Sequence, residues 1–89
     1  MKTQMQKLTA TLPDGRIVAR LTAHPYKYVV AQRVTGGTDV PSNITLNEWY
    51  DIYWTSTLDY AEKHVRGIQS YPVVKRGQLI IENKIVPVV

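Results

Sequence analysis

Residues 6–23 contain the pattern that most restricts the fold of this chain, because apolar and polar residues alternate on both sides of a short turn sequence. The alternating apolar residues are Leu8, Ala10 and Leu12 before the turn, and Ile17, Ala19 and Leu21 after it. A period of two is typical of strands with one buried face, and Asp14-Gly15 between two such runs is a strong hairpin signal. The sequence therefore predicts a β-hairpin over residues 6–23.

The length of the turn decides the register of this hairpin. A two-residue turn at Asp14-Gly15 gives cross-strand pairs that are all apolar, namely Leu12–Ile17, Ala10–Ala19 and Leu8–Leu21. A three-residue loop instead pairs Leu12 with Arg16 and puts the two apolar sets on opposite faces. Because a slip of one residue moves every side chain to the other face, we expect the two-residue turn. The outer face is then polar and basic, and carries Lys7, Thr9, Thr11, Arg16, Val18, Arg20 and Thr22.

Two further segments predict strands in the middle of the chain. Residues 26–34 are rich in β-branched and aromatic residues, which favours a third strand. Residues 44–55 are ambiguous, because Thr45 and Glu48 match a helix capping box whereas the bulky aromatic residues favour a strand. We expect a strand over residues 48–55.

A helix is expected after Ser56, a candidate N-cap that places Asp59 at the third helical position. Its apolar residues at helical spacing are Leu58, Ala61, Val65 and Ile68. Residues 73–74 and 78–88 are strand-like, and Pro87 suits a terminal or edge position. The chain is thus expected to form one domain over residues 1–89 of the α+β class, a mainly antiparallel β-sheet of four to six strands with one helix packed on one face.

The composition argues against several kinds of chemistry. The 89 residues include no cysteine, which excludes disulfides and thiol catalysis. His24 and His64 have no second ligand at metal-binding spacing, and no phosphate-binding loop or nucleophile elbow is present. We therefore expect a binding protein, not an enzyme, with no catalytic residue, metal or cofactor. The apolar runs are far shorter than the ~20 residues of a membrane helix, so a cytoplasmic protein without membrane contact is expected.

Charge is unevenly distributed along the chain, although the net charge is only +4. Residues 1–35 are strongly basic, and residues 36–60 contain acidic residues without Lys or Arg. The candidate basic surface consists of Lys7, Arg16, Arg20, Lys27 and Arg33, a set that suits phosphate groups. A mild positive excess also serves solubility alone, so this charge pattern does not by itself establish a nucleic-acid partner.

A second candidate surface lies in the acidic middle of the chain, where aromatic residues are close in sequence to Glu and Asp. It consists of Glu48, Trp49, Tyr50, Asp51, Tyr53 and Trp54. Aromatic anchors surrounded by carboxylates suit a basic protein surface. On a strand the four aromatic residues cannot all enter one core, although each can cover the end of a small core.

Four stretches of the chain resemble the short single-domain accessory proteins of bacteriophages and prophages. They are Thr11-Leu-Pro-Asp-Gly15, Tyr26-Lys-Tyr-Val-Val30, Trp54-Thr-Ser56 with the following Leu58 and Ala61-Glu-Lys63, and Ile85-Val-Pro-Val88. Within this group the chain is similar to anti-CRISPR inhibitors in size, in its lack of catalytic motifs and in its segregated charge. The resemblance implies an inhibitor that blocks a nucleic-acid-targeting defence complex, a protein or ribonucleoprotein in the cytoplasm of a bacterial host. Many such inhibitors are acidic DNA mimics, and the positive net charge departs from that pattern.

Two other functions remain open at this point. A small basic nucleic-acid-binding module would use the basic surface. A structural or assembly subunit would use an exposed strand edge, and either a monomer or a homodimer fits the sequence.

Overall fold

The structure, a computed structural model, describes residues 4–89, which form five strands and two helices. In chain order the elements are β1 (Gln6–Thr11), β2 (Ile17–Thr22), β3 (Tyr28–Gly36), β4 (Tyr50–Thr55), α1 (Leu58–Gln69), α2 (Pro72–Lys75) and β5 (Ile80–Pro87). All strand pairs are antiparallel. The predicted α+β class is therefore confirmed, with one main helix packed against a sheet. The strands divide into two sheets, the hairpin β1-β2 and a three-stranded sheet in the order β4-β3-β5.

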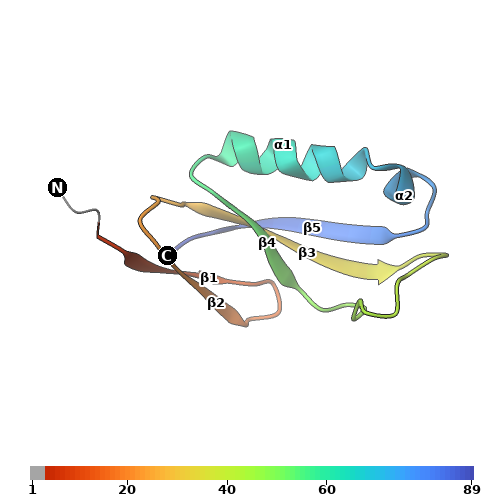
Figure 1. Ribbon diagram of the computed structural model, residues 1–89, viewed down its shortest axis with the longest axis horizontal. Coiled ribbons are helices and arrows are strands. Elements are labelled where there is room, and N and C mark those ends of the chain that lie inside the picture. Colours follow the sequence, from red (N-terminus) through yellow and green to blue (C-terminus); the bar gives the residue numbers. More distant parts are fainter. Residues whose placement is uncertain (1–3) are drawn as a thin grey trace.

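The elements form three layers, with the three-stranded sheet in the middle (Figure 1). Helix α1 lies over one face of this sheet, and the hairpin lies against the other face. A backbone bridge between Ala10 and Val88 joins the hairpin to the residue that follows β5. The result is an elongated molecule with extents of 51 × 24 × 19 Å. Such a thin arrangement leaves strand edges at the surface.

The central strand β3, which is rich in β-branched residues, carries core residues to both faces. Val29 and Ala31 face the hairpin, where Val29 packs with Ala10 and Trp54, and Ala31 packs with Leu12 and Trp49. The alternate residues Val30 and Val34 are buried on the face that α1 covers. The buried residues of α1 are Ala61 and Ile68. The core is thus split between two thin interfaces.

The hairpin forms in a register one residue away from the predicted register. The N–H of Leu12 donates to the carbonyl of Arg16 at 2.8 Å, and the N–H of Gly15 donates to the carbonyl of Leu12 at 2.9 Å. These bonds close a three-residue loop in which Gly15 has a φ of 91°. A turn followed by a left-handed glycine is a common loop of this length. The observed pairs are Thr11–Ile17, Ala10–Val18, Thr9–Ala19, Leu8–Arg20 and Lys7–Leu21, so the predicted pairs are wrong.

Contacts with the three-stranded sheet explain this register. It directs Val18 toward the cluster of Ala10, Val29 and Trp54, and it brings Arg16 and Arg20 to the same side of the hairpin. The two arginines make hydrogen bonds and aromatic contacts there, described below. The cost is that Ile17, Ala19 and Leu21 of β2 face outward, and Ile17 and Leu21 are 67% and 66% exposed.

Strand β4 and helix α1 form where the sequence predicts them, with small shifts in their boundaries. The preferred strand over residues 48–55 is confirmed as β4, and a register shift opposite Val30 and Ala31 leaves Ile52 without a cross-strand partner. The N-cap of α1 is Thr57, whose side chain accepts a hydrogen bond from the N–H of Tyr60 at 3.2 Å. The prediction of Ser56 as N-cap is wrong because Thr57 is the last residue with extended backbone before the helix.

The segment after α1 also differs from the prediction. Val73 and Val74 were expected in a strand, but they lie in the single helical turn α2. Proline is favoured at the start of a helix because its fixed φ suits the first turn, and Pro72 stands there. Strand β5 begins only at Ile80, and Pro87 ends it at the sheet edge, as expected.

Candidate binding surface

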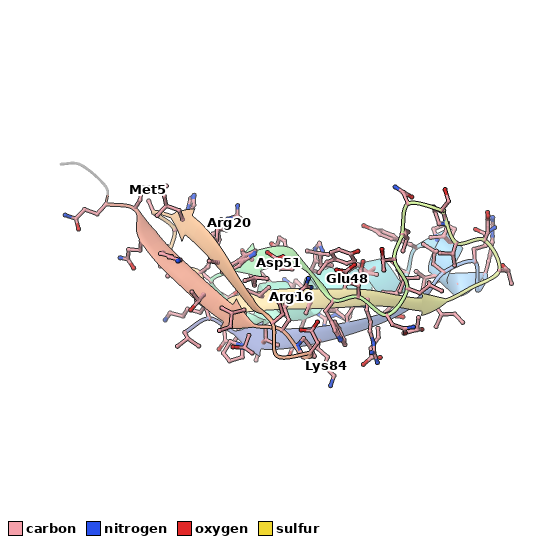
Figure 2. The ribbon with its side chains drawn as sticks, turned by 90° about the horizontal axis from the view of Figure 1, so that it is seen from below. Met5, Arg16, Arg20, Glu48, Asp51 and Lys84 are labelled. Carbon is pink, nitrogen blue, oxygen red and sulfur yellow. The ribbon has the colours of Figure 1, made fainter. Side chains whose placement is uncertain are left out.

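The two sets of candidate residues, which the sequence separates, meet where the hairpin turn contacts the segment before β4. Arg16 lies at this contact: its Nη1 is 3.4 Å from Oε1 of Glu48, and its Nη2 donates a hydrogen bond to the main-chain carbonyl of Trp49. Figure 2 shows Arg16 and Glu48 close together on the hairpin side of the sheet. The other carboxylate oxygen of Glu48 accepts a hydrogen bond from the Tyr50 hydroxyl at 2.7 Å. Glu48 therefore bridges a residue of the hairpin turn and a residue of β4.

The hydrogen bond with Glu48 also affects the ionisation of Tyr50. Donation to the carboxylate raises the pKa of Tyr50 above its ordinary value of 10.0, whereas Thr45 and, more weakly, Arg16 act in the opposite direction. Because Tyr50 is 43% exposed, its ring is accessible while its hydroxyl is held. The phenol thus remains neutral at ordinary pH and its orientation is fixed.

Two more arginines of the basic set contact rings of the aromatic set. The guanidinium of Arg33 lies 4.8 Å from the ring centre of Trp49, and its Nη2 is 2.7 Å from Oε2 of Glu82. The guanidinium of Arg20 lies 5.3 Å from the ring centre of Tyr26 and 6.0 Å from that of Trp54. Cations over aromatic faces are stabilising, so these arginines help to cover the hairpin side of the core.

The five basic residues do not form one continuous face. Lys7 pairs with Leu21 and lies on the outer face of the hairpin, whereas Arg16 and Arg20 lie on the inner face. The prediction that these three residues share the outer face is therefore wrong, because it depended on the two-residue turn. Lys27 precedes β3, where its backbone bonds to Thr55 and Val88.

The acidic and aromatic set is distributed over both faces of the sheet, as a strand requires. Trp49 and Trp54 are buried beneath the hairpin, at 4% and 6% exposure, and the indole N–H of Trp54 donates to Asp51 at 2.9 Å. Tyr53 lies on the helix side and stacks on His64, with ring centres 4.2 Å apart. The two tryptophans are thus core residues and are not accessible as anchors.

The accessible residues of this set are Glu48, Tyr50 and Asp51, and together with Ile52 they form a short stretch that we call the β4 surface. Figure 2 shows Glu48 and Asp51 on the same side of the molecule. Ile52 is 37% exposed at the irregularity of β4, and it was missing from the sequence-based set because a regular strand gives no reason to single it out. Among residues 4–89, no strand pairs with the outer side of β4.

Some kinds of site are not found in the part of the chain that the structure describes. Residues 4–89 enclose no pocket and contain no group of three or more His, Asp or Glu side chains placed to hold a metal ion. Over the same residues, neither helix has the length and apolar character needed to cross a membrane. No protein-family model, curated protein or solved structure matches this chain.

Proposed function

We propose that this protein is a non-catalytic binding protein that docks on a partner protein through the β4 surface. The observation that supports this most directly is the fixed setting of Tyr50, whose hydroxyl is held by Glu48 while Glu48 is held by Arg16. Tyrosine is enriched among the residues that dominate binding energy. A side chain that is already oriented loses less conformational entropy when a partner covers it.

The charges beside Tyr50 indicate the chemistry of the partner. Glu48 accepts the hydrogen bond of the Tyr50 hydroxyl, Asp51 follows Tyr50 in β4, and residues 36–60 contain no Lys or Arg. Arg16 offsets part of the charge of Glu48, whereas Asp51 is exposed and accepts a hydrogen bond from Trp54. A basic protein surface with an apolar recess for Tyr50 and Ile52 is the complementary partner.

The resemblance to phage accessory proteins suggests the identity of that partner. A host complex that targets nucleic acid presents a basic groove for its substrate, and the carboxylates of Glu48 and Asp51 can occupy such a groove in place of phosphates. Binding there would block the complex without any chemical step. The net charge of +4 does not oppose this, because the contact is made by the acidic segment only.

An affinity capture from bacterial lysate tests the proposal. The immobilised chain is expected to retain a stoichiometric protein or ribonucleoprotein, and Tyr50→Ala is expected to weaken its retention at least about tenfold, the effect of losing a strong anchor residue. Tyr60→Ala is the matched control, because Tyr60 is also exposed but lies on α1, outside the β4 surface. An equal loss of retention in both variants would contradict docking through the β4 surface. Capture of free nucleic acid alone, with a steep salt dependence, would favour the basic module instead.

A further inference from the structure

Strand β2 has one open side. Its partner is β1, and no other strand within residues 4–89 pairs with it. The N–H of Leu12 bonds to the carbonyl of Arg16, so Arg16 directs its backbone groups into the hairpin. Every second residue after it, namely Val18 and Arg20, does the same. The remaining residues of β2 direct their N–H and C=O groups outward, and they are Ile17, Ala19 and Leu21. The same alternation holds on β1, where the carbonyl of Thr9, opposite Ala19, accepts a bond from Val89 outside the hairpin.

The same three residues place apolar side chains on the outer face of the hairpin. Ile17 and Leu21 are two of the most exposed large apolar residues in residues 4–89. Exposed edge strands in natural proteins are usually protected by a proline, a bulge or a charged residue. Strand β2 contains no proline and pairs with β1 without a bulge, and its charged residue Arg20 lies against Tyr26 on the inner face. An unprotected apolar edge of this kind is a template for another strand.

We propose that β2 pairs antiparallel with β2 of a second copy of this chain, around a twofold axis at Ala19. In this register Ala19 lies opposite Ala19 of the second copy, and Ile17 lies opposite Leu21. All outward N–H and C=O groups of the three residues then find a partner, because they form the hydrogen-bonded pairs of the new ladder. The arrangement is self-complementary, as a twofold interface requires.

The side chains also fit this register. The outer face gains a continuous apolar row in which Ile17 contacts Leu21 of the other copy on both sides of the axis. On the inner face Arg20 lies opposite Val18, so the two copies of Arg20 are only diagonal neighbours, roughly 7–8 Å apart along the sheet. A shift by two residues in either direction leaves outward groups of Ile17 or Leu21 without a partner. The register centred on Ala19 is therefore the one that uses the whole edge.

Disulfide trapping tests this register directly, because the chain has no cysteine of its own. In Ala19→Cys the two introduced cysteines are expected about 5.5 Å apart between Cα atoms, within disulfide range. In the control Ile17→Cys, the cysteines are four residues out of register, roughly 14 Å apart. Under mild oxidation Ala19→Cys should give a covalent dimer at several times the yield of Ile17→Cys. Equal yields would overturn the register.

A pair of charge variants tests the same contact without a covalent bond. Both replace the exposed Ile17 and Leu21, so both lose the same apolar contact. Ile17→Lys with Leu21→Lys puts lysine opposite lysine at both ends of the ladder and is expected to be monomeric. Ile17→Glu with Leu21→Lys puts glutamate opposite lysine at both ends and is expected to dimerise. Circular dichroism confirms that each variant is folded, and identical masses for the two variants would contradict the proposal.

Sedimentation of the unmodified chain completes the test. The mass is expected to rise with concentration from 10.1 kDa toward twice that value, because a six-residue strand gives a small and reversible interface. A mass of 10.1 kDa at every concentration would overturn the dimer and leave the edge for a strand of another protein. The purified chain alone is used, so this outcome does not depend on the proposed docking of the β4 surface.

Discussion

Arg16 is the residue at which the hairpin turn and the β4 surface meet. The predicted two-residue turn placed it on the solvated outer face of the hairpin. Its guanidinium instead reaches Glu48 and the carbonyl of Trp49. An ion pair as exposed as Arg16–Glu48 contributes little to stability, ~0–1 kcal/mol. Its main effect is therefore to orient Glu48, and through Glu48 the ring of Tyr50.

The titration of Tyr50 reports on this arrangement. Its raised pKa means that the bond from the neutral phenol to Glu48 stabilises the fold fully below the unfolded pKa of 10.0 and is lost as pH rises through the folded pKa. We expect the ultraviolet difference titration between the unmodified chain and Tyr50→Phe to show a step above pH 10.0. Glu48→Gln removes the charge and should move this step to lower pH. An unchanged step in Glu48→Gln would show that Glu48 does not hold the phenol.

At the scale of elements, the sequence predicted most of the strands and the main helix, because their patterns are local. The hairpin, the strand after Pro25, β4 and α1 were all expected within a few residues. The hairpin register was not predictable in this way, because counting apolar pairs ignores what Arg16 and Arg20 contact outside the hairpin. The alternative three-residue loop was visible in the sequence, but nothing local favoured it.

The loop conformation of the hairpin leads to a stability prediction. Gly15 has a φ of 91° with open space around it, so Gly15→Ala should destabilise the fold by about 1–2 kcal/mol through backbone strain alone. The melting temperature should fall by roughly 4–8 °C for each kcal/mol. Gly67→Ala is the matched control, because Gly67 is helical, also has open space, and should gain roughly 0.5–1 kcal/mol. The changes in melting temperature of the two variants should therefore have opposite signs. An unchanged melting temperature in Gly15→Ala would contradict the three-residue loop.

The start of α1 gives a second stability prediction, again with a control in the adjacent residue. Thr57→Ala removes the side-chain acceptor for the N–H of Tyr60 and should cost about 1 kcal/mol of unfolding free energy. Ser56→Ala should be nearly neutral, because Ser56 is not the cap. Urea unfolding of the two variants measures the difference. A larger loss in Ser56→Ala would restore the sequence-based assignment of the cap.

At the scale of the whole molecule, some basic and acidic residues that are far apart in the sequence come into contact. Arg16 contacts Glu48, and Arg33 contacts Glu82, across 32 and 49 residues of sequence. Contacts over such separations depend on the packing of the hairpin on the sheet, so the two predicted surfaces could not be seen to meet from the sequence. What remains accessible is the β4 surface on one edge and the apolar side of β2 on another.

Both surfaces depend on the hairpin register, because it directs Arg16 inward to Glu48 and turns Ile17 and Leu21 outward. Nuclear Overhauser contacts between α-protons of facing strand residues measure this register directly. We expect strong contacts for Thr9–Ala19 and Lys7–Leu21, the pairs that face each other without mutual hydrogen bonds. Strong contacts for Ala10–Ala19 and Leu8–Leu21 instead would show the two-residue turn, and they would contradict both the β4 surface and the exposed edge of β2.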